Sequence, residues 1–182
     1  DLVIKLPERQ NWQERLFGSD DMHLLRKCPC PVWLIQPRAR NTYRRILAAV
    51  DVDNAYPQKE LETRRALNHQ VIELASSLAL AESAELHIVH AWDAPGESAM
   101  RHSAFTKTSD ESVDDWVEQP RDEIPALAKR IDADLIVMGT VARTGVLGFI
   151  MGNTAETILN RIDCSVLALK PPGFTSPVTL DE

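Results

Sequence analysis

Four glycines between residues 139 and 152 are the residues whose type and spacing best suit binding chemistry. They follow a short apolar run, 134–138, and precede a stretch at 153–161 with the composition of a helix. A glycine directly after a strand lets a ligand approach the backbone, and free N–H groups at the start of a helix can hold a phosphate. The spacing predicts either a phosphate-binding loop or glycines that only turn the chain and pack a helix against a strand.

Polar side chains beside these glycines could complete such a site. Arg143 adds a positive charge, and Asn153 or Thr154 can cap the helix or donate a hydrogen bond to a phosphate. The pattern is neither G-x-G-x-x-G nor G-x-x-x-x-G-K-[ST], and it lacks the lysine of the second motif. By residue type alone, the loop is therefore a weak nucleotide motif.

Other reactive residues point to no metal or catalytic centre. Cys28 and Cys30 could bind a metal or exchange disulfides, but no second pair or nearby histidine cluster supports a zinc site. We expect Cys30 and Cys164 to be small buried core residues. His87 and His90 are three apart on a predicted strand and should face opposite sides. We predict no metal ligands and no catalytic residues, and enzymatic activity is not the favoured interpretation.

Alternating strands and helices are expected to position the loop. Short apolar or β-branched runs predict the strands and amphipathic or capped stretches predict the helices. Such alternation implies parallel pairing with right-handed crossovers, hence an open parallel α/β sheet with helices on both faces and ligands beyond the carboxyl ends of the strands. The predicted strands are 44–51, 85–92, 134–138 and 165–170, and the predicted helices are 60–84, 120–131 and 153–161.

The sequence contains an internal repeat. Residues 17–37 align with residues 151–171 without a gap at a shift of 134, which places Gly18 on Gly152 and Cys30 on Cys164. Residues 1–4 align with 134–137 after a slip of one residue. We therefore predict three parts, which are the carboxyl-terminal remnant of a first domain at 1–40, a second domain at 41–172 and a tail at 173–182. Because the chain begins without methionine and within a strand, we expect it to be a fragment.

Composition narrows the classes of partner. The chain has 182 residues, 44% of them hydrophobic, and a formal net charge of -7, which disfavours nucleic acid as a partner. No apolar stretch is long enough to cross a bilayer, and the amino terminus lacks the pattern of a signal peptide. Three cysteines do not form a secreted disulfide framework. We expect reduced thiols, a cytoplasmic location and no membrane partner.

Four segments together resemble the universal stress protein family, and the repeat resembles its tandem-domain branch. The segments are RRILAAVDVD, ELHIVHAWD, ADLIVMGTVARTG and MGNTAETILNRIDCSVLALKPP. The resemblance implies a Rossmann-like fold of the adenine nucleotide alpha hydrolase-like type, with a five-stranded parallel sheet and, in the nucleotide-binding members, a pocket for ATP with Mg²⁺. It also implies domain pairing or a homodimer through the last strand, here Val166, Leu167, Ala168 and Leu169.

The family's nucleotide-binding members carry G-x-x-G, nine residues, and then glycine followed by serine or threonine. In this chain Gly139 and Gly152 match, whereas Ala142 replaces the second glycine and Asn153 replaces the hydroxyl residue. The Ala142 methyl group stands where backbone approaches phosphate or adopts positive φ. By the same matching Asp51 stands where an aspartate meets the base, although it could instead cap a turn. The candidate binding residues are Asp51, Ala91, Gly139, Ala142, Arg143, Gly152, Asn153 and Thr154.

Between the second strand and the helix at 120, the family places a further helix and an edge strand. Here the interval around 94–120 is short, polar and without a strand, so either an edge has been deleted or residues are skipped. Three functions follow as hypotheses. The first is a stress-response regulatory or ligand-binding module with a degenerate nucleotide loop. The second is an ATP-binding switch or slow ATPase in which Asp51, Arg143 and Asn153 hold Mg-ATP, and the third is a structural pairing module.

Overall fold

The computed structural model describes seven segments of the chain, and all structural statements below concern them. Within them lie the helices α1 (Ser19–Lys27), α2 (Gln58–Glu82), α4 (Pro120–Arg130) and α5 (Asn153–Leu159). The strands are β1 (Val3–Lys5), β2 (Val32–Leu34), β3 (Arg45–Val50), β4 (Glu85–His90), β5 (Leu135–Gly139), β6 (Val141–Gly145), β7 (Gly148–Met151) and β8 (Ser165–Leu169). The segments are residues 1–6, 19–37, 42–52, 57–90, 120–145, 148–151 and 153–176.

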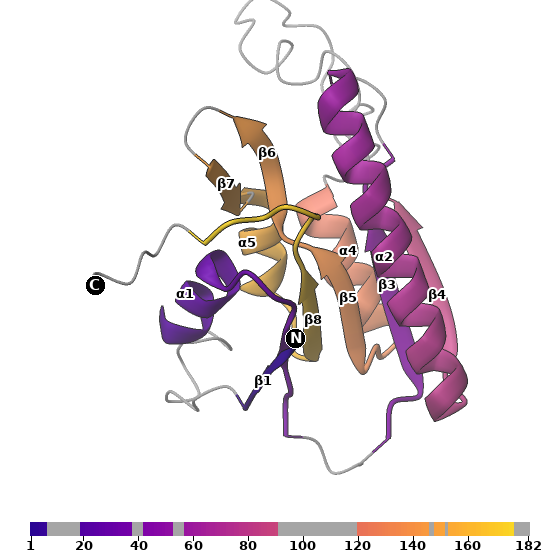
Figure 1. Ribbon diagram of the computed structural model, residues 1–182. Helices are drawn as coiled ribbons and strands as arrows, with labels where there is room; N and C mark the ends of the chain where they lie inside the picture. Colours follow the sequence, from indigo (N-terminus) through magenta and orange to yellow (C-terminus); the bar gives the residue numbers. More distant parts are fainter. Residues whose placement is uncertain are drawn as a thin grey trace, which may run out of the picture.

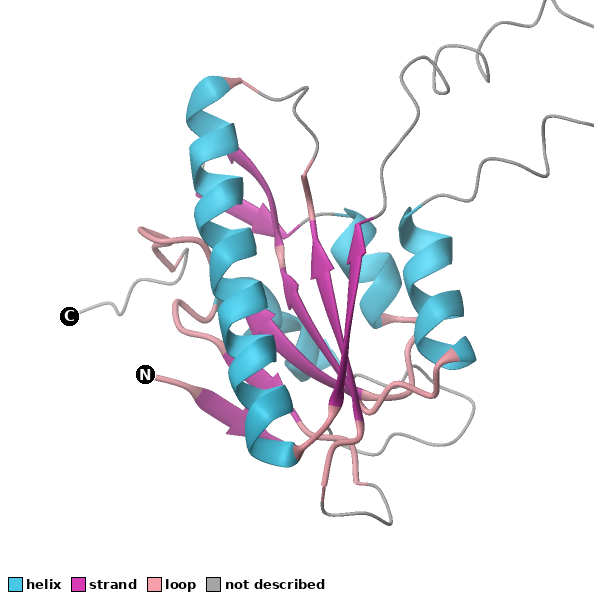
Figure 2. Ribbon diagram, turned by 90° about the vertical axis from the view of Figure 1, so that its right-hand side faces the viewer, coloured by secondary structure: helices cyan, strands magenta, loops and turns pink. Residues whose placement is uncertain are grey.

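The described strands form a six-stranded sheet in the order β1-β2-β8-β5-β3-β4, and a separate hairpin of β6 and β7. The four strands from β8 to β4 are parallel, as are β1 and β2, whereas β2 and β8 are antiparallel. Helix α2 covers one face of the sheet, and α1, α4 and α5 lie on the other (Figures 1 and 2). The predicted open α/β sheet with helices on both faces is confirmed. The described sheet has six strands and is mixed, not the expected five-stranded parallel sheet, because β1 and β2 join it through the antiparallel contact of β2 with β8.

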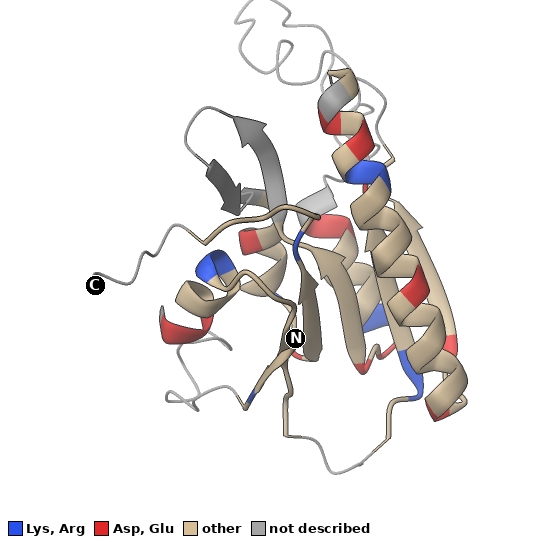
Figure 3. Ribbon diagram, viewed as in Figure 1, with Lys and Arg blue, Asp and Glu red and all other residues tan. Residues whose placement is uncertain are grey.

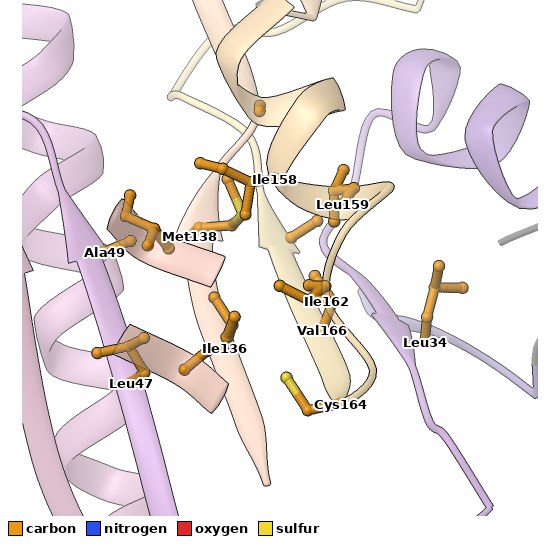
Figure 4. Packing of buried hydrophobic residues seen from close by; sticks show 14 of the residues in the cluster. Leu34, Leu47, Ala49, Ile136, Met138, Ile158, Leu159, Ile162, Cys164 and Val166 are labelled. Atoms are coloured by element: carbon orange, nitrogen blue, oxygen red, sulfur yellow. The ribbon is translucent and has the colours of Figure 1, made fainter. Parts of the chain in front are cut away.

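The central strands are apolar along their length because both of their faces are covered. Along β5, Leu135 and Val137 pack toward α2, whereas Ile136 and Met138 pack toward α4 and α5. Figure 4 shows the cluster on the side of α4 and α5, which contains Ile136 and Met138. Figure 3 shows that β5 and β8 carry no charged residue. The stripe of α2 that covers the sheet repeats every four residues, as an amphipathic helix requires, and consists of Leu67, Val71, Ala75 and Ala79.

The antiparallel ladder between β2 and β8 is symmetric with respect to the sequence repeat. Trp33 pairs with Leu167, and these two residues are 134 positions apart, so they are equivalent in the repeat. The flanking pairs, Val32 with Ala168 and Leu34 with Val166, exchange equivalent positions across that centre. This is the contact pattern of a local two-fold axis. Helices α1 and α5 begin at equivalent residues, Ser19 and Asn153.

Candidate functional site

The strand order places the candidate site between β3 and β5. From β3 the chain passes to β4 on one side, and it later returns to β5 on the other side. Ligands of open α/β sheets bind beyond the carboxyl ends of the strands at such a switch point. Asp51 and Thr140 both stand two residues beyond the paired residues Ala49 and Met138, so they occupy corresponding positions at this edge.

Asp51 contacts two residues of α2, Arg64 and Asn68, and Arg64 is in turn paired with Glu60. The Asp51 carboxylate forms an ion pair with Arg64, whose guanidinium also binds the Glu60 carboxylate at 2.8 Å. The Asp51 backbone N–H donates to Asn68 Oδ1 at 3.0 Å, and the Asn68 amide donates back to the Asp51 carbonyl. The Asp51 side chain is 40% exposed, whereas Arg64 is 13% exposed. Asp51 thus lies at the predicted edge, with its carboxylate already paired with Arg64.

Sequence reasoning missed Glu60, Arg64 and Asn68. The sequence could have revealed them by their spacing, because residues four apart lie on the same face of a helix. That face is turned toward the end of β3, where all three meet Asp51 or one another.

Gly139 ends β5 and packs against α2. A Cβ at this position would lie 2.5 Å from Leu67 Cδ2 and 3.0 Å from Leu67 Cγ. The backbone of Gly139 is not in the left-handed region, so space and not conformation excludes a side chain. Packing of helix against strand, one of the two sequence-based interpretations of the loop, therefore explains this glycine.

A buried lysine closes the edge beside Gly139. Lys170 directly follows β8, and its ammonium donates to the Leu25 carbonyl at 2.5 Å and to Thr140 Oγ1 at 2.6 Å. The Thr140 N–H and hydroxyl both donate to the Leu169 carbonyl, at 3.2 and 3.3 Å. The Phe174 ring lies 5.0 Å from Lys170 Nζ. Burial lowers the pKa of Lys170 to about 8, and interaction with Cys28 opposes that shift.

The glycine loop contains a hairpin that the sequence analysis did not predict. Strand β6 pairs with β7 in an antiparallel ladder that ends with Gly145 opposite Gly148. The register shifts between Val141 and Arg143, which leaves Ala142 as the extra residue of a β-bulge. The short β-branched and aromatic runs of this hairpin lie between glycines, and their length was too small to be recognised as strands.

The remaining predicted site residues are only partly placed. Arg143 belongs to β6 and Asn153 opens α5, and for both only the backbone is described. Thr154 is exposed on α5. Ala91 and Gly152 lie outside the described residues. The structure thus brings Asp51 and Gly139 to one edge and leaves the side-chain contacts of the loop as predictions.

No metal centre is formed within the described segments. They contain no group of three or more His, Cys, Asp or Glu residues able to hold an ion. His90 Nδ1 instead lies 3.3 Å from the Val52 nitrogen and 3.3 Å from the Val50 carbonyl. Among the same segments, no helix has the length and apolar character needed to cross a membrane.

Comparison with known proteins identifies the class of protein that has this fold. The family model described as "Universal stress protein family" matches residues 97–170. A Pseudomonas aeruginosa UCBPP-PA14 protein assigned to the universal stress proteins has a solved structure that is 34% identical, with a TM-score of 0.70 over 93% of this chain and 63% of the other. A universal stress protein from Archaeoglobus fulgidus DSM 4304 is 21% identical and, at a TM-score of 0.59 over 93% of this chain and 62% of the other, shares the fold.

This chain belongs to the universal stress protein family. Its relatives include Universal stress protein E of Salmonella typhi, which is 31% identical over 212 residues covering 100% of this chain and 64% of the relative. The chain resembles this E type along its whole length, and it spans less than two thirds of that relative's length. The alignment of 212 positions also exceeds the 182 residues of this chain, so the relative contains residues that this chain lacks within the matched region.

Proposed function

We propose that this chain is a non-catalytic regulatory module of the stress response, with a degenerate nucleotide loop that does not hold ATP as the family's nucleotide-binding members do. The observation that carries the proposal is that the polar groups at the switch point already have partners within the protein. Asp51 is paired with Arg64, and Thr140 with Lys170 and the Leu169 carbonyl. A nucleotide would have to replace these contacts, and groups left without their partners cost binding energy.

The loop departs from the nucleotide-binding pattern in a way that supports the same proposal. Ala142 occupies the bulge of the β6–β7 hairpin and carries a methyl group where the pattern has glycine. Asn153 replaces the hydroxyl residue, although its amide can still donate a hydrogen bond. The two departures weaken phosphate binding at opposite ends of one loop.

The alternative is an ATP-binding switch or slow ATPase in which Asp51, Arg143 and Asn153 hold Mg-ATP. One observation favours it: the Asp51 side chain is 40% exposed at the switch point, where a base would reach it. In this function Arg64 would orient the carboxylate instead of competing with the ligand.

We further propose that the module works in the cytoplasm, without nucleic acid or membrane partners, and that the last strand is its pairing element. The outer edge of β8 is covered by β2 of the same chain. The local two-fold arrangement of this ladder supports pairing of repeat units within a tandem chain. A homodimer through the same edge of β8 would first have to displace β2.

Isothermal titration with Mg-ATP tests the proposal. We compare the native chain with the double change Ala142→Gly and Asn153→Ser. We expect binding heat only in the double variant, because the restored phosphate contacts would offset the cost of replacing the internal pairs. Micromolar binding by the native chain would refute the proposal. Phosphate release that disappears in Gly152→Arg would then identify the slow ATPase. If neither chain binds, the loop departures are not the cause, and Arg64→Met added to the double variant tests the Asp51 pair.

A further inference from the structure

Two half-buried cysteines face each other at the end of α1. Cys28 and Cys30 are both free thiols, and their sulfur atoms lie 3.3 Å apart. The Cys28 N–H donates to the Leu24 carbonyl at 2.9 Å, which anchors Cys28 to the last turn of the helix. Pro29, the residue between them, is exposed, and its ring restricts the backbone that links the two cysteines. The two thiols are therefore held close together at a position that reagents can reach.

The second repeat unit supplies an internal comparison. A shift of 134 residues places Cys28 on Ile162 and Cys30 on Cys164. Ile162 is 2% exposed and Cys164 is 1% exposed, and both belong to the core (Figure 4). The expectation of a small buried core residue is thus correct for Cys164, whereas Cys30 is only half-buried and was assigned to the core wrongly. Cys28 packs against the margin of this core, but core packing does not explain Cys30 or the contact between the two sulfurs.

The groups around the two cysteines differ in how they affect the protonation of each thiol. Hydrogen bonding to Cys28 raises the pKa of the Cys30 thiol, and burial acts in the same direction. Either sulfur can be the donor of the 3.3 Å contact, and the raised pKa of Cys30 favours the arrangement in which Cys30 keeps its proton. Lys170 brings a positive charge to the same region, because its ammonium binds the Leu25 carbonyl of α1 and interacts with Cys28. A negatively charged Cys28 sulfur would be attracted to that ammonium.

We propose that Cys28 and Cys30 form a reversible dithiol–disulfide pair that reacts with small-molecule disulfides. The Cys28 thiolate attacks one sulfur of the small disulfide, forms a mixed disulfide and releases one thiolate. Cys30 then loses its proton and attacks the Cys28 sulfur, which releases the second thiolate. The protein loses two electrons and two protons, and the small disulfide is reduced to two thiols. The sulfurs must approach from 3.3 Å to about 2.05 Å.

Incubation of the reduced full chain with oxidised glutathione, followed by tryptic mass mapping, tests the proposal. Trypsin cleaves after Lys27 and Arg38, so peptide 28–38 contains both cysteines of the pair and not Cys164. We expect this peptide to lose about 2 Da, the mass of two hydrogens, and to carry no glutathione. Dithiothreitol should restore the original mass.

Two variants serve as matched controls. Cys164→Ala removes the buried cysteine and should leave the result unchanged. Cys28→Ile copies the second repeat unit and should leave Cys30 without a partner, so any glutathione that binds Cys30 stays attached. The proposal is overturned if peptide 28–38 of the native chain remains reduced, accumulates glutathione adducts, or is joined to the peptide that contains Cys164.

Discussion

Replacement of Gly139 by alanine separates packing from ligand binding at the end of β5. The new Cβ would lie 2.5 Å from Leu67 Cδ2, well inside the 3.5 to 4.0 Å at which carbon atoms normally meet. Leu67 is 8% exposed and belongs to the core cluster beneath α2, so it has little space to move. Overpacking of this kind costs about 1–3 kcal/mol. Because the nearest atom is the end of a side chain, we expect about 1–2 kcal/mol.

A double-mutant cycle measured by urea unfolding assigns the cost to this contact. Leu67→Ala alone should lower the free energy of unfolding by about 2–5 kcal/mol through the cavity it leaves. In the Leu67→Ala background, Gly139→Ala should cost less than about 0.5 kcal/mol, which gives a coupling of about 0.5 kcal/mol or more. Equal costs in the two backgrounds, or no cost in either, would refute the packing explanation.

Two further predictions concern buried charged groups. Because the pKa of Lys170 falls from its ordinary value of 10.5 to about 8, the unfolded chain binds more protons between these pH values. Across this window the free energy of unfolding should rise with pH in the native chain, by up to about 3 kcal/mol more than in Lys170→Met. If plots of the free energy of unfolding against pH are parallel for the two proteins, the prediction is wrong. Asp134 Oδ2 accepts from the backbone N–H groups of Arg44 at 2.8 Å and Arg45 at 3.0 Å. Asp134→Ala should therefore lower the free energy of unfolding by about 2–4 kcal/mol in a urea melt. Asp134→Asn keeps an acceptor oxygen and should lower it by less. Equal losses in the two variants would contradict the role of Asp134 as acceptor of these hydrogen bonds.

Much of the fold could be predicted because the apolar pattern of each element reflects how it is covered. Helix α2 spans Gln58–Glu82, close to the predicted 60–84, since its stripe of apolar residues repeats every four positions. The strands β3, β5 and β8 also lie within two residues of their predicted bounds, because strands buried on both faces are continuous apolar runs. Residues 94–119 of the interval around 94–120 lie outside the described residues, so the prediction for this interval stays open.

The candidate site was less predictable, because its contacts join residues that are distant in sequence. The position of Asp51 follows from strand order, whereas its pairing with Arg64 depends on which face of α2 meets the sheet. Lys170 resembled an ordinary charged residue after a strand, and its burial results from α1 and Phe174 closing over it. The β6–β7 hairpin was missed because its strands, of four or five residues each, are too short to show the alternation of apolar and polar residues that predicts a strand.

The central claim is that the native switch point between β3 and β5 does not bind ATP, because its internal pairs and the departures at Ala142 and Asn153 act together. Amide NMR of the native chain during titration with Mg-ATP tests it directly, because the signals of Asp51, Gly139 and Thr140 report on this edge. We predict no saturable change at these three amides, even when ATP is in large excess. Saturable shifts at all three, with a common affinity, would contradict the claim and favour the ATP-binding switch.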